Sequence, residues 1–159
     1  MQITLANIED CKELSKLKKS IWEDTYRGIY SDEKINNFNF DKTELKYKNY
    51  ILSNEENVYV CKNSNEIVGF LVIGKPIHGS LDNYKTCIND LGVKKEYRKQ
   101  GIGKMFFEYI KNNYTNYYNC CNYYNENGKK FYEKMGGKVV KSEPSDNKEY
   151  YQLYYVYDK

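Results

Sequence analysis

The residues best suited to chemistry lie in a basic turn punctuated by glycines. The turn reads Arg98-Lys99-Gln100-Gly101-Ile102-Gly103-Lys104 and leads into a run with helical apolar spacing. The first N–H groups of a helix lack internal acceptors, and the helix dipole makes that end partly positive. Glycine lets the backbone approach a ligand or adopt a positive φ, and Arg98 can bond a phosphate through two N–H groups. The turn therefore predicts an anion-binding site.

Two familiar phosphate loops do not fit this turn. A dinucleotide fingerprint requires a third glycine where Phe106 stands, and a P-loop requires Ser or Thr where Met105 stands. The pattern that fits is R-x-x-G-x-G, from Arg98 to Gly103. It resembles the pyrophosphate-binding signature of the GNAT superfamily of N-acetyltransferases, which bind acetyl-coenzyme A (acetyl-CoA). For the turn alone, an ordinary helix cap with a solvated basic face remains an alternative.

A second segment, from Asn125 to Gly137, resembles the other GNAT signature. In that signature an asparagine precedes a short helix carrying Phe-Tyr-Glu-Lys, here residues 131–134, and the helix ends at glycine. Local preferences agree, because asparagine is a good N-cap and Gly136-Gly137 supplies a C-terminal stop. The two signatures occur in the family's order, so together they make the resemblance specific.

The elements that position these residues follow from apolar periodicity. Alternation over 87–93 predicts a strand before the turn, and the spacing from Gly101 onward predicts a helix after it. Asn7, Ser31 and Asp41 are expected to cap three helices. Further strands are expected at 2–5, 57–62, 67–74, 115–123, 138–142 and 149–157. The predicted class is α/β, with one GNAT-like domain over 1–159 and a mixed sheet of about seven strands flanked by helices. The predicted order is β-α-α-β-β-β-α-β-α-β-β, with room for one more helix before the second strand.

The resemblance implies how the donor half of a reaction is built. It implies transfer of an acetyl group from acetyl-CoA to a primary amine of a small molecule or peptide, by direct attack in a ternary complex. The backbone at Leu91, Gly92 and Val93 would pair with the pantetheine arm and polarise the thioester carbonyl. The turn Arg98–Lys104 would bind the pyrophosphate, and Asn125 would hydrogen-bond the cofactor arm.

The resemblance also suggests the catalytic acid and the acceptor region. Tyr132 would lie near the CoA sulfur and protonate the leaving thiolate as general acid. Trp22 and Tyr26 belong to a segment that faces the acceptor in the family. The general base is open, because Cys87 stands where many relatives have glutamate; a cysteine there is either an inert core residue, which we favour, or an unusual proton acceptor. Asp90 is the nearest carboxylate and is the candidate base, although a surface or capping carboxylate explains the same residue and is favoured.

Several carboxylates bear on the choice of acceptor. An acidic group in the presumed acceptor region fits a cationic amine, although solvated helix faces explain the same residues and are favoured. The residues are Glu23, Asp24, Asp32 and Glu33, of which Glu23 and Asp24 are further options for the base, as is an ordered water chain. Candidate acceptors include polyamines, aminoglycosides, amino-acid amines and protein N-termini.

Bulk composition narrows the class of partner. The 25 Lys and Arg residues nearly balance the 22 Asp and Glu residues, for a net charge of +3, so no nucleic-acid partner is expected. The five cysteines have no metal-ligand spacing and His78 is the single histidine, so no metal is expected. No membrane-length apolar run or signal peptide is present, so no membrane partner is expected, and free thiols suit the cytoplasm. Family members are often dimers, which leaves a homodimer open.

A second class of function also stays open. The chain could be a catalytically weakened module that binds or senses acyl-CoA, having kept the cofactor site. The departure from the family pattern at Cys87 is its main support.

Overall fold

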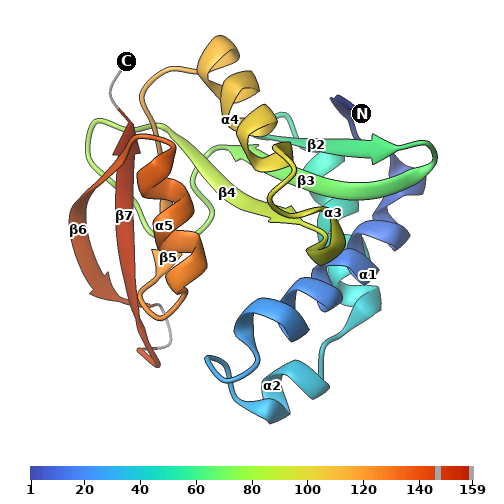
Figure 1. The fold of residues 1–159 in the computed structure, drawn as a ribbon, viewed down its shortest axis with the longest axis horizontal. Coiled ribbons are helices and arrows are strands. Elements are labelled where there is room, and N and C mark those ends of the chain that lie inside the picture. Colours follow the sequence, from blue (N-terminus) through green and yellow to red (C-terminus); the bar gives the residue numbers. More distant parts are fainter. Residues whose placement is uncertain (146–147, 158–159) are drawn as a thin grey trace. The chain divides into compact units, whose positions relative to one another are not determined.

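The computed structural model describes residues 1–145 and 148–157, and its seven strands form one mixed sheet (Figure 1). The strand order is β1-β2-β3-β4-β5-β7-β6. The pair β4/β5 is parallel, whereas β1/β2, β5/β7 and β6/β7 are antiparallel. The predicted α/β class and seven-strand mixed sheet are therefore confirmed. The strands are β1 (Gln2–Leu5), β2 (Glu56–Asn63), β3 (Glu66–Gly74), β4 (Thr86–Val93), β5 (Tyr117–Asn122), β6 (Gly137–Pro144) and β7 (Tyr151–Tyr157).

Within the described residues, five α-helices accompany the strands. They are α1 (Cys11–Ile21), α2 (Asp32–Asn36), α3 (Phe40–Leu52), α4 (Ile102–Asn113) and α5 (Glu126–Lys134). Three of them precede β2, so the additional early helix is present as the five-residue α2.

The chain divides into two compact units. The first contains Met1–Val72 and Asp90–Phe106, and the second contains Ile73–Asn89 and Phe107–Lys159. The expectation of one domain over residues 1–159 stays a prediction.

In the first unit, helices cover both faces of β3. Gly69 and Phe70 are consecutive in this strand, so they face opposite sides of the sheet. Phe70 packs into a core with residues of α1 and α3, including the fully buried Tyr47. On the other face, a Cβ at Gly69 would lie 3.0 Å from Phe106 and 3.2 Å from Ile102, both in α4. Glycine here lets the first turns of α4 pack closely on the strand.

The helix starts test the predicted caps. Asn7 forms a capping box with Asp10 and begins a 3₁₀ turn that continues into α1, as expected. The hydroxyl of Ser31 accepts the Lys34 N–H at 3.2 Å and caps α2, also as expected.

The prediction that Asp41 caps the third helix is wrong. The cap is Asn39, whose side-chain oxygen accepts the Lys42 N–H at 2.9 Å from an extended backbone conformation. Asp41 already lies within the first helical turn, where a carboxylate interacts favourably with the helix dipole.

In the second unit, β5, β6 and β7 form an antiparallel group with a tyrosine-rich core. Tyr118 of β5 and Tyr154 of β7 stack with centroids 5.9 Å apart, and both are fully buried. The strand predicted over 115–123 is shorter than expected, because Asn116 has φ 51° and a left-handed residue cannot continue a strand. The strand predicted over 149–157 also begins late, at Tyr151.

Candidate active site

The turn that follows β4 has the geometry of an anion-binding loop. Arg98 Nε donates to the carbonyl oxygen of Val93 at 3.0 Å, which ties the turn back to the end of the strand. The left-handed residues Lys99 (φ 60°) and Gly101 (φ 88°) then direct the chain into α4. The Met105 N–H bonds the Gly101 carbonyl at 2.9 Å. The backbone N–H groups of the three preceding helical residues, 102–104, therefore point out of the helix N-terminus.

The backbone conformation differs between the two glycines of the turn, Gly101 and Gly103. A Cβ at Gly101 would meet nothing within 4 Å, so its positive φ is what favours glycine there. Gly103 is the second residue of α4, where a helical conformation needs no glycine. The expectation that Gly103 lets a ligand approach the backbone stays a prediction.

Gly92 lies inside the packing of the first unit. A Cβ at this position would lie 2.4 Å from Ile21 Cδ1 and 2.7 Å from Phe70 Cε1. Glycine therefore lets α1 pack against the end of β4. Leu91 and Val93, its neighbours, are half-buried.

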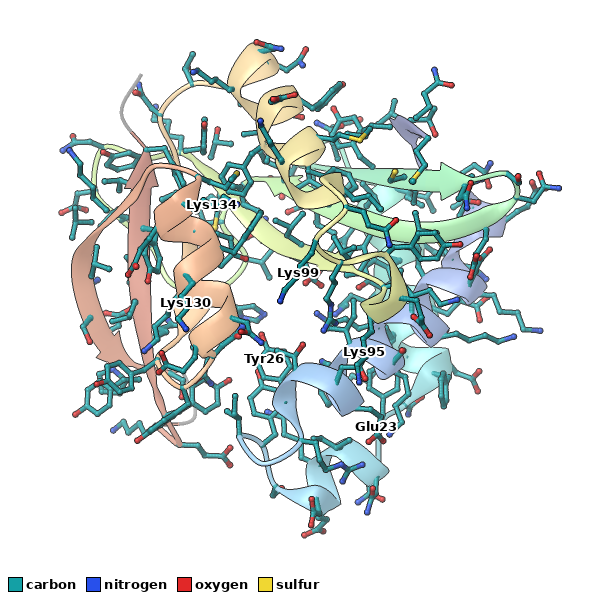
Figure 2. All side chains as sticks on the ribbon, viewed as in Figure 1. Glu23, Tyr26, Lys95, Lys99, Lys130 and Lys134 are labelled. Atoms are coloured by element: carbon teal, nitrogen blue, oxygen red, sulfur yellow. The ribbon has the colours of Figure 1, made fainter. Side chains whose placement is uncertain are left out.

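Asn125 and Tyr132 lie in the second unit, where Asn125 precedes α5 and Tyr132 lies within it. The side-chain oxygen of Asn125 accepts the Gly128 N–H at 2.9 Å, so the predicted N-cap is confirmed. Tyr132 is half-buried, with its ring centroid 5.5 Å from Phe131 and 5.7 Å from Tyr155. Lys130 and Lys134 project from the same helix one turn apart (Figure 2).

Trp22 and Tyr26 bound a π-helical turn that follows α1. The Arg27 N–H bonds the Trp22 carbonyl at 3.0 Å and closes this wider turn. Such turns are rare and occur often at functional sites. The Tyr26 ring stacks on Tyr30 with centroids 4.5 Å apart, and the Trp22 ring meets Phe38 edge-on at 5.0 Å.

A cavity of about 670 Å³ opens beside this turn in the first unit. Trp22 lines it, whereas Tyr26 is not among its lining residues. Its walls come from α1, the segment around α2, and α3, and combine lysines with aromatic and amide side chains. The lining residues are Lys18, Trp22, Lys34, Asn37, Phe38, Asn39, Lys42, Thr43, Leu45, Lys46, Asn49 and Tyr50.

Asp90 is held by two groups of this region. Lys18 Nζ lies 2.8 Å from each of its carboxylate oxygens, and the Tyr47 hydroxyl donates to it at 3.3 Å. Burial and the nearby carboxylate hold the pKa of Tyr47 well above its ordinary value, so this tyrosine stays a donor. Asp90 is thus a fixed counter-charge to Lys18, and its role as a base stays a prediction.

Cys87 is an unsuitable proton acceptor. Its side chain is buried, and burial is the main cause that raises the pKa of its thiol to about 12. A thiol with that pKa is protonated near neutral pH. The interpretation of Cys87 as an inert core residue is therefore favoured over a catalytic thiolate.

The acidic residues near the π-helical turn are engaged by cations. Glu23, labelled in Figure 2, accepts from Arg27 at 2.6 Å and from Lys19 at 2.9 Å, and these bonds lower the pKa of its carboxyl group. Arg27 also reaches Asp32 at 3.1 Å, and Asp24 lies 3.7 Å from Arg98. In the described part of the chain, neither these carboxylates nor Glu33 lines the cavity.

Sequence reasoning missed the lysines of the cavity wall. Lys18 is four residues after Leu14 and three before Ile21, so helical spacing places it beside the apolar face of α1. Lys42, Lys46 and Asn49 have the corresponding spacing on α3. The sequence signal that could have predicted these lysines is the repetition of basic residues on one face of a helix.

Two kinds of site are absent from the described residues. Residues 1–145 and 148–157 contain no group of three His, Cys, Asp or Glu side chains placed to hold a metal ion. In the same residues, no helix is both long enough and apolar enough to cross a membrane.

Solved structures share this fold over nearly the whole chain. PaiA N-acetyltransferase from Thermoplasma acidophilum, in complex with coenzyme A, is 24% identical with a TM-score of 0.80 and covers 99% of this chain and 98% of its own. YjaB from Escherichia coli, in its apo form, is 21% identical with a TM-score of 0.72 and covers 98% and 96%. At these identities the likeness shows the fold.

Sequence comparisons show the family. The uncharacterized N-acetyltransferase YuaI of Bacillus subtilis (strain 168) is 27% identical over 100 residues, which are 62% of this chain and 56% of that protein. This chain thus matches little more than half the length of that relative. The family model of the acetyltransferase (GNAT) domain matches residues 54–136, including the R-x-x-G-x-G turn and most of the Asn125–Gly137 segment. Because that match covers more than half of the chain, the chain belongs to the GNAT acetyltransferase family.

Proposed function

We propose that this protein transfers an acetyl group from acetyl-CoA to a primary amine of a small molecule or peptide. The observation that carries the proposal is the turn between β4 and α4. It joins a helix N-terminus to a positive-φ glycine, Gly101, and to the basic residues Arg98 and Lys99. This combination suits a pyrophosphate such as that of coenzyme A. The complex of PaiA with coenzyme A supports the same ligand.

The donor is bound mainly by backbone groups. The N–H groups of 102–104 and the side chains of Arg98 and Lys99 bind the pyrophosphate. The exposed Lys95 and Lys99 add positive charge between β4 and α4 (Figure 2). The backbone of Leu91–Val93 pairs with the pantetheine arm and polarises the thioester carbonyl. Asn125 contributes its amide NH₂ to the arm.

The reaction is a direct transfer between two bound reactants. An alkylammonium near pKa about 10 first loses a proton, for which Asp90 is the proposed acceptor. The neutral nitrogen attacks the thioester carbonyl carbon and forms a tetrahedral intermediate. As this intermediate collapses, the C–S bond breaks, the nitrogen loses its extra proton to solvent, and the acetyl group remains on nitrogen. Tyr132 gives its proton to the leaving thiolate, and the tyrosine is then reprotonated from solvent. Holding both reactants in line supplies much of the rate.

The test is turnover of acetyl-CoA, read as free thiol release, across a panel of primary amines. Release that depends on the amine, with the acetylated amine found by mass spectrometry, is the expected result. No release above the hydrolysis background with any amine contradicts a transferase.

A second candidate is a module that binds acyl-CoA with weakened catalysis. The observation favouring it is that Cys87 is a neutral buried thiol and Asp90 is already engaged by Lys18. This candidate predicts tight acetyl-CoA binding by calorimetry together with no amine-dependent thiol release.

We also propose that the protein acts in a reducing compartment such as the cytoplasm. No disulfide joins the five cysteines, all of which lie in the described residues. Structural disulfides are typical of oxidising compartments, and reduced thiols are typical of the cytoplasm.

A further inference from the structure

The cavity of the first unit is lined by four lysines. Lys18 comes from α1, Lys34 from α2, and Lys42 and Lys46 from α3. No Asp or Glu is among the described residues that line it. All of these elements belong to one compact unit, so the positive charge of the wall is a property of that unit.

The charge of this wall is poorly compensated inside the protein. Within the described ranges, Lys18 is paired with Asp90, whereas the other three ammonium groups have no carboxylate partner. Burial is the main cause that lowers the pKa of Lys46, and the nearby Lys18 and Lys42 lower it further. The Asp90 carboxylate raises the pKa of Lys46, but the pKa stays below the ordinary value of a lysine. A bound anion would offset this repulsion.

The aromatic part of the wall already carries a cation. Lys34 Nζ lies 5.8 Å from the centroid of the Trp22 ring, which lines the cavity, and 4.1 Å from that of Tyr30, which does not. An aromatic surface can hold a cationic ligand, but a second ammonium beside Lys34 would be repelled. Trp22 and Phe38 both line the cavity and can contact the apolar part of a ligand.

We infer that this cavity binds an acceptor amine that also carries a carboxylate or a phosphate. The inference rests on the proposed transferase function and names its substrate class. Lys42 and Lys46 bind the anionic group. Lys18 lines the same cavity and bonds Asp90, which directly precedes the proposed donor-binding segment Leu91–Val93. An acceptor anchored by its anion at α3 extends its amine toward β4. This substrate class differs from the cationic acceptors that Glu23, Asp24, Asp32 and Glu33 would fit.

The first test measures binding without catalysis. Trp22 is the single tryptophan of the chain and lines the cavity, so its fluorescence reports occupancy. Titration with O-phosphoethanolamine should give a saturable change at a concentration at least about 10-fold lower than titration with ethanolamine, which differs only in the phosphate. Equal responses, or a stronger response to ethanolamine, would overturn the inference.

Matched variants test whether the lysines that line the cavity cause the fluorescence response. Lys46→Gln should weaken O-phosphoethanolamine binding about 10-fold, as should Lys42→Gln. The control is Lys48→Gln on the same helix, because Lys48 is paired with Glu44 at 3.0 Å and does not line the cavity. It should leave binding unchanged. Equal losses in all three variants, with unchanged thermal midpoints, would show that general charge binds the anion and would overturn the inference.

The second test separates this inference from the proposed function. The acceptors 4-aminobutyrate and 1,4-diaminobutane have similar length and differ in whether the far end is a carboxylate or an ammonium. We expect kcat/KM to favour 4-aminobutyrate about 10-fold or more, and Lys46→Gln to remove most of that preference. Turnover that favours the diamine overturns the inference and supports the transferase. Fluorescence binding as expected, with no thiol release from any amine, contradicts the transferase and supports the anion site.

Discussion

Lys18 Nζ lies 2.8 Å from both carboxylate oxygens of Asp90, and the two residues are 72 positions apart in the chain. The pair joins α1 to β4 at the residue before Leu91. The side chain of Lys18 is 14% exposed and that of Asp90 is 20% exposed. The carboxylate therefore has two candidate roles, as a counter-charge for Lys18 and as the base for the amine.

Substitution of the two partners separates these roles. Asp90→Asn leaves the ammonium of Lys18 half-buried without its counter-charge and should cost about 1–3 kcal/mol of stability. If Asp90 accepts the amine proton, Asp90→Asn should lower kcat about 10²-fold or more. Lys18→Met keeps the carboxylate and should retain most of kcat. Similar kcat values for both variants, measured where each is folded, would assign Asp90 a positioning role.

Lys46→Met should stabilise the protein at neutral pH. Burial lowers the pKa of Lys46 in the folded protein below its ordinary value of 10.5. At alkaline pH between these two pKa values, Lys46 is therefore protonated more in the unfolded state than in the folded state. The free energy of unfolding of the wild type should therefore rise with pH through this range, and this rise should be absent in Lys46→Met. Removing the buried charge should add about 0.5–2 kcal/mol near pH 7. Urea denaturation at several pH values measures this.

The control for Lys46→Met is Lys42→Met, one helical turn earlier. Lys42 is exposed, so its removal should change stability by less than about 0.5 kcal/mol. A loss of stability in Lys46→Met would show that its packing and its attraction to Asp90 outweigh the cost of its burial.

Gly103→Val should raise the Kd for coenzyme A about 100-fold or more. The branched side chain would occupy the space at the helix N-terminus where the pyrophosphate approaches the backbone. Lys111→Val is the control, because it places valine at an exposed position of the same helix, where it costs about 0.5 kcal/mol of helix stability. Calorimetry measures both affinities. Unchanged affinity in Gly103→Val would mean that this turn is not the pyrophosphate site.

Tyr132→Phe should lower kcat about 10²-fold with little change in the affinity for acetyl-CoA. It removes the proposed proton donor and keeps the ring, which lies beside Phe107, Phe131 and Tyr155. The control is Tyr124→Phe, which removes a hydroxyl from an exposed tyrosine just before α5. Steady-state kinetics with thiol detection gives the comparison. Wild-type turnover in Tyr132→Phe would assign the proton to another donor.

Local sequence signals predicted the elements that carry the donor turn. The alternation over 87–93, the helical spacing after Gly101 and the Asn125 cap each arise within a few residues, because strand, helix and capping preferences are short-range. Where two local signals competed, the prediction was less accurate. Asn39 and Asp41 are both good cap residues, and the structure has Asn39 as the cap.

The sequence by itself determined the family, the mixed sheet and the turn that would hold a pyrophosphate, because those depend on residue type and short spacing. Only the tertiary structure decided the charge of the cavity beside Trp22. It gathers Lys18, Lys34, Lys42 and Lys46 from three helices and pairs Glu23 and Asp32 with Arg27 instead. The reason is physical: the field inside a cavity is set by which charges face it and which are already paired, and both depend on contacts between distant parts of the chain.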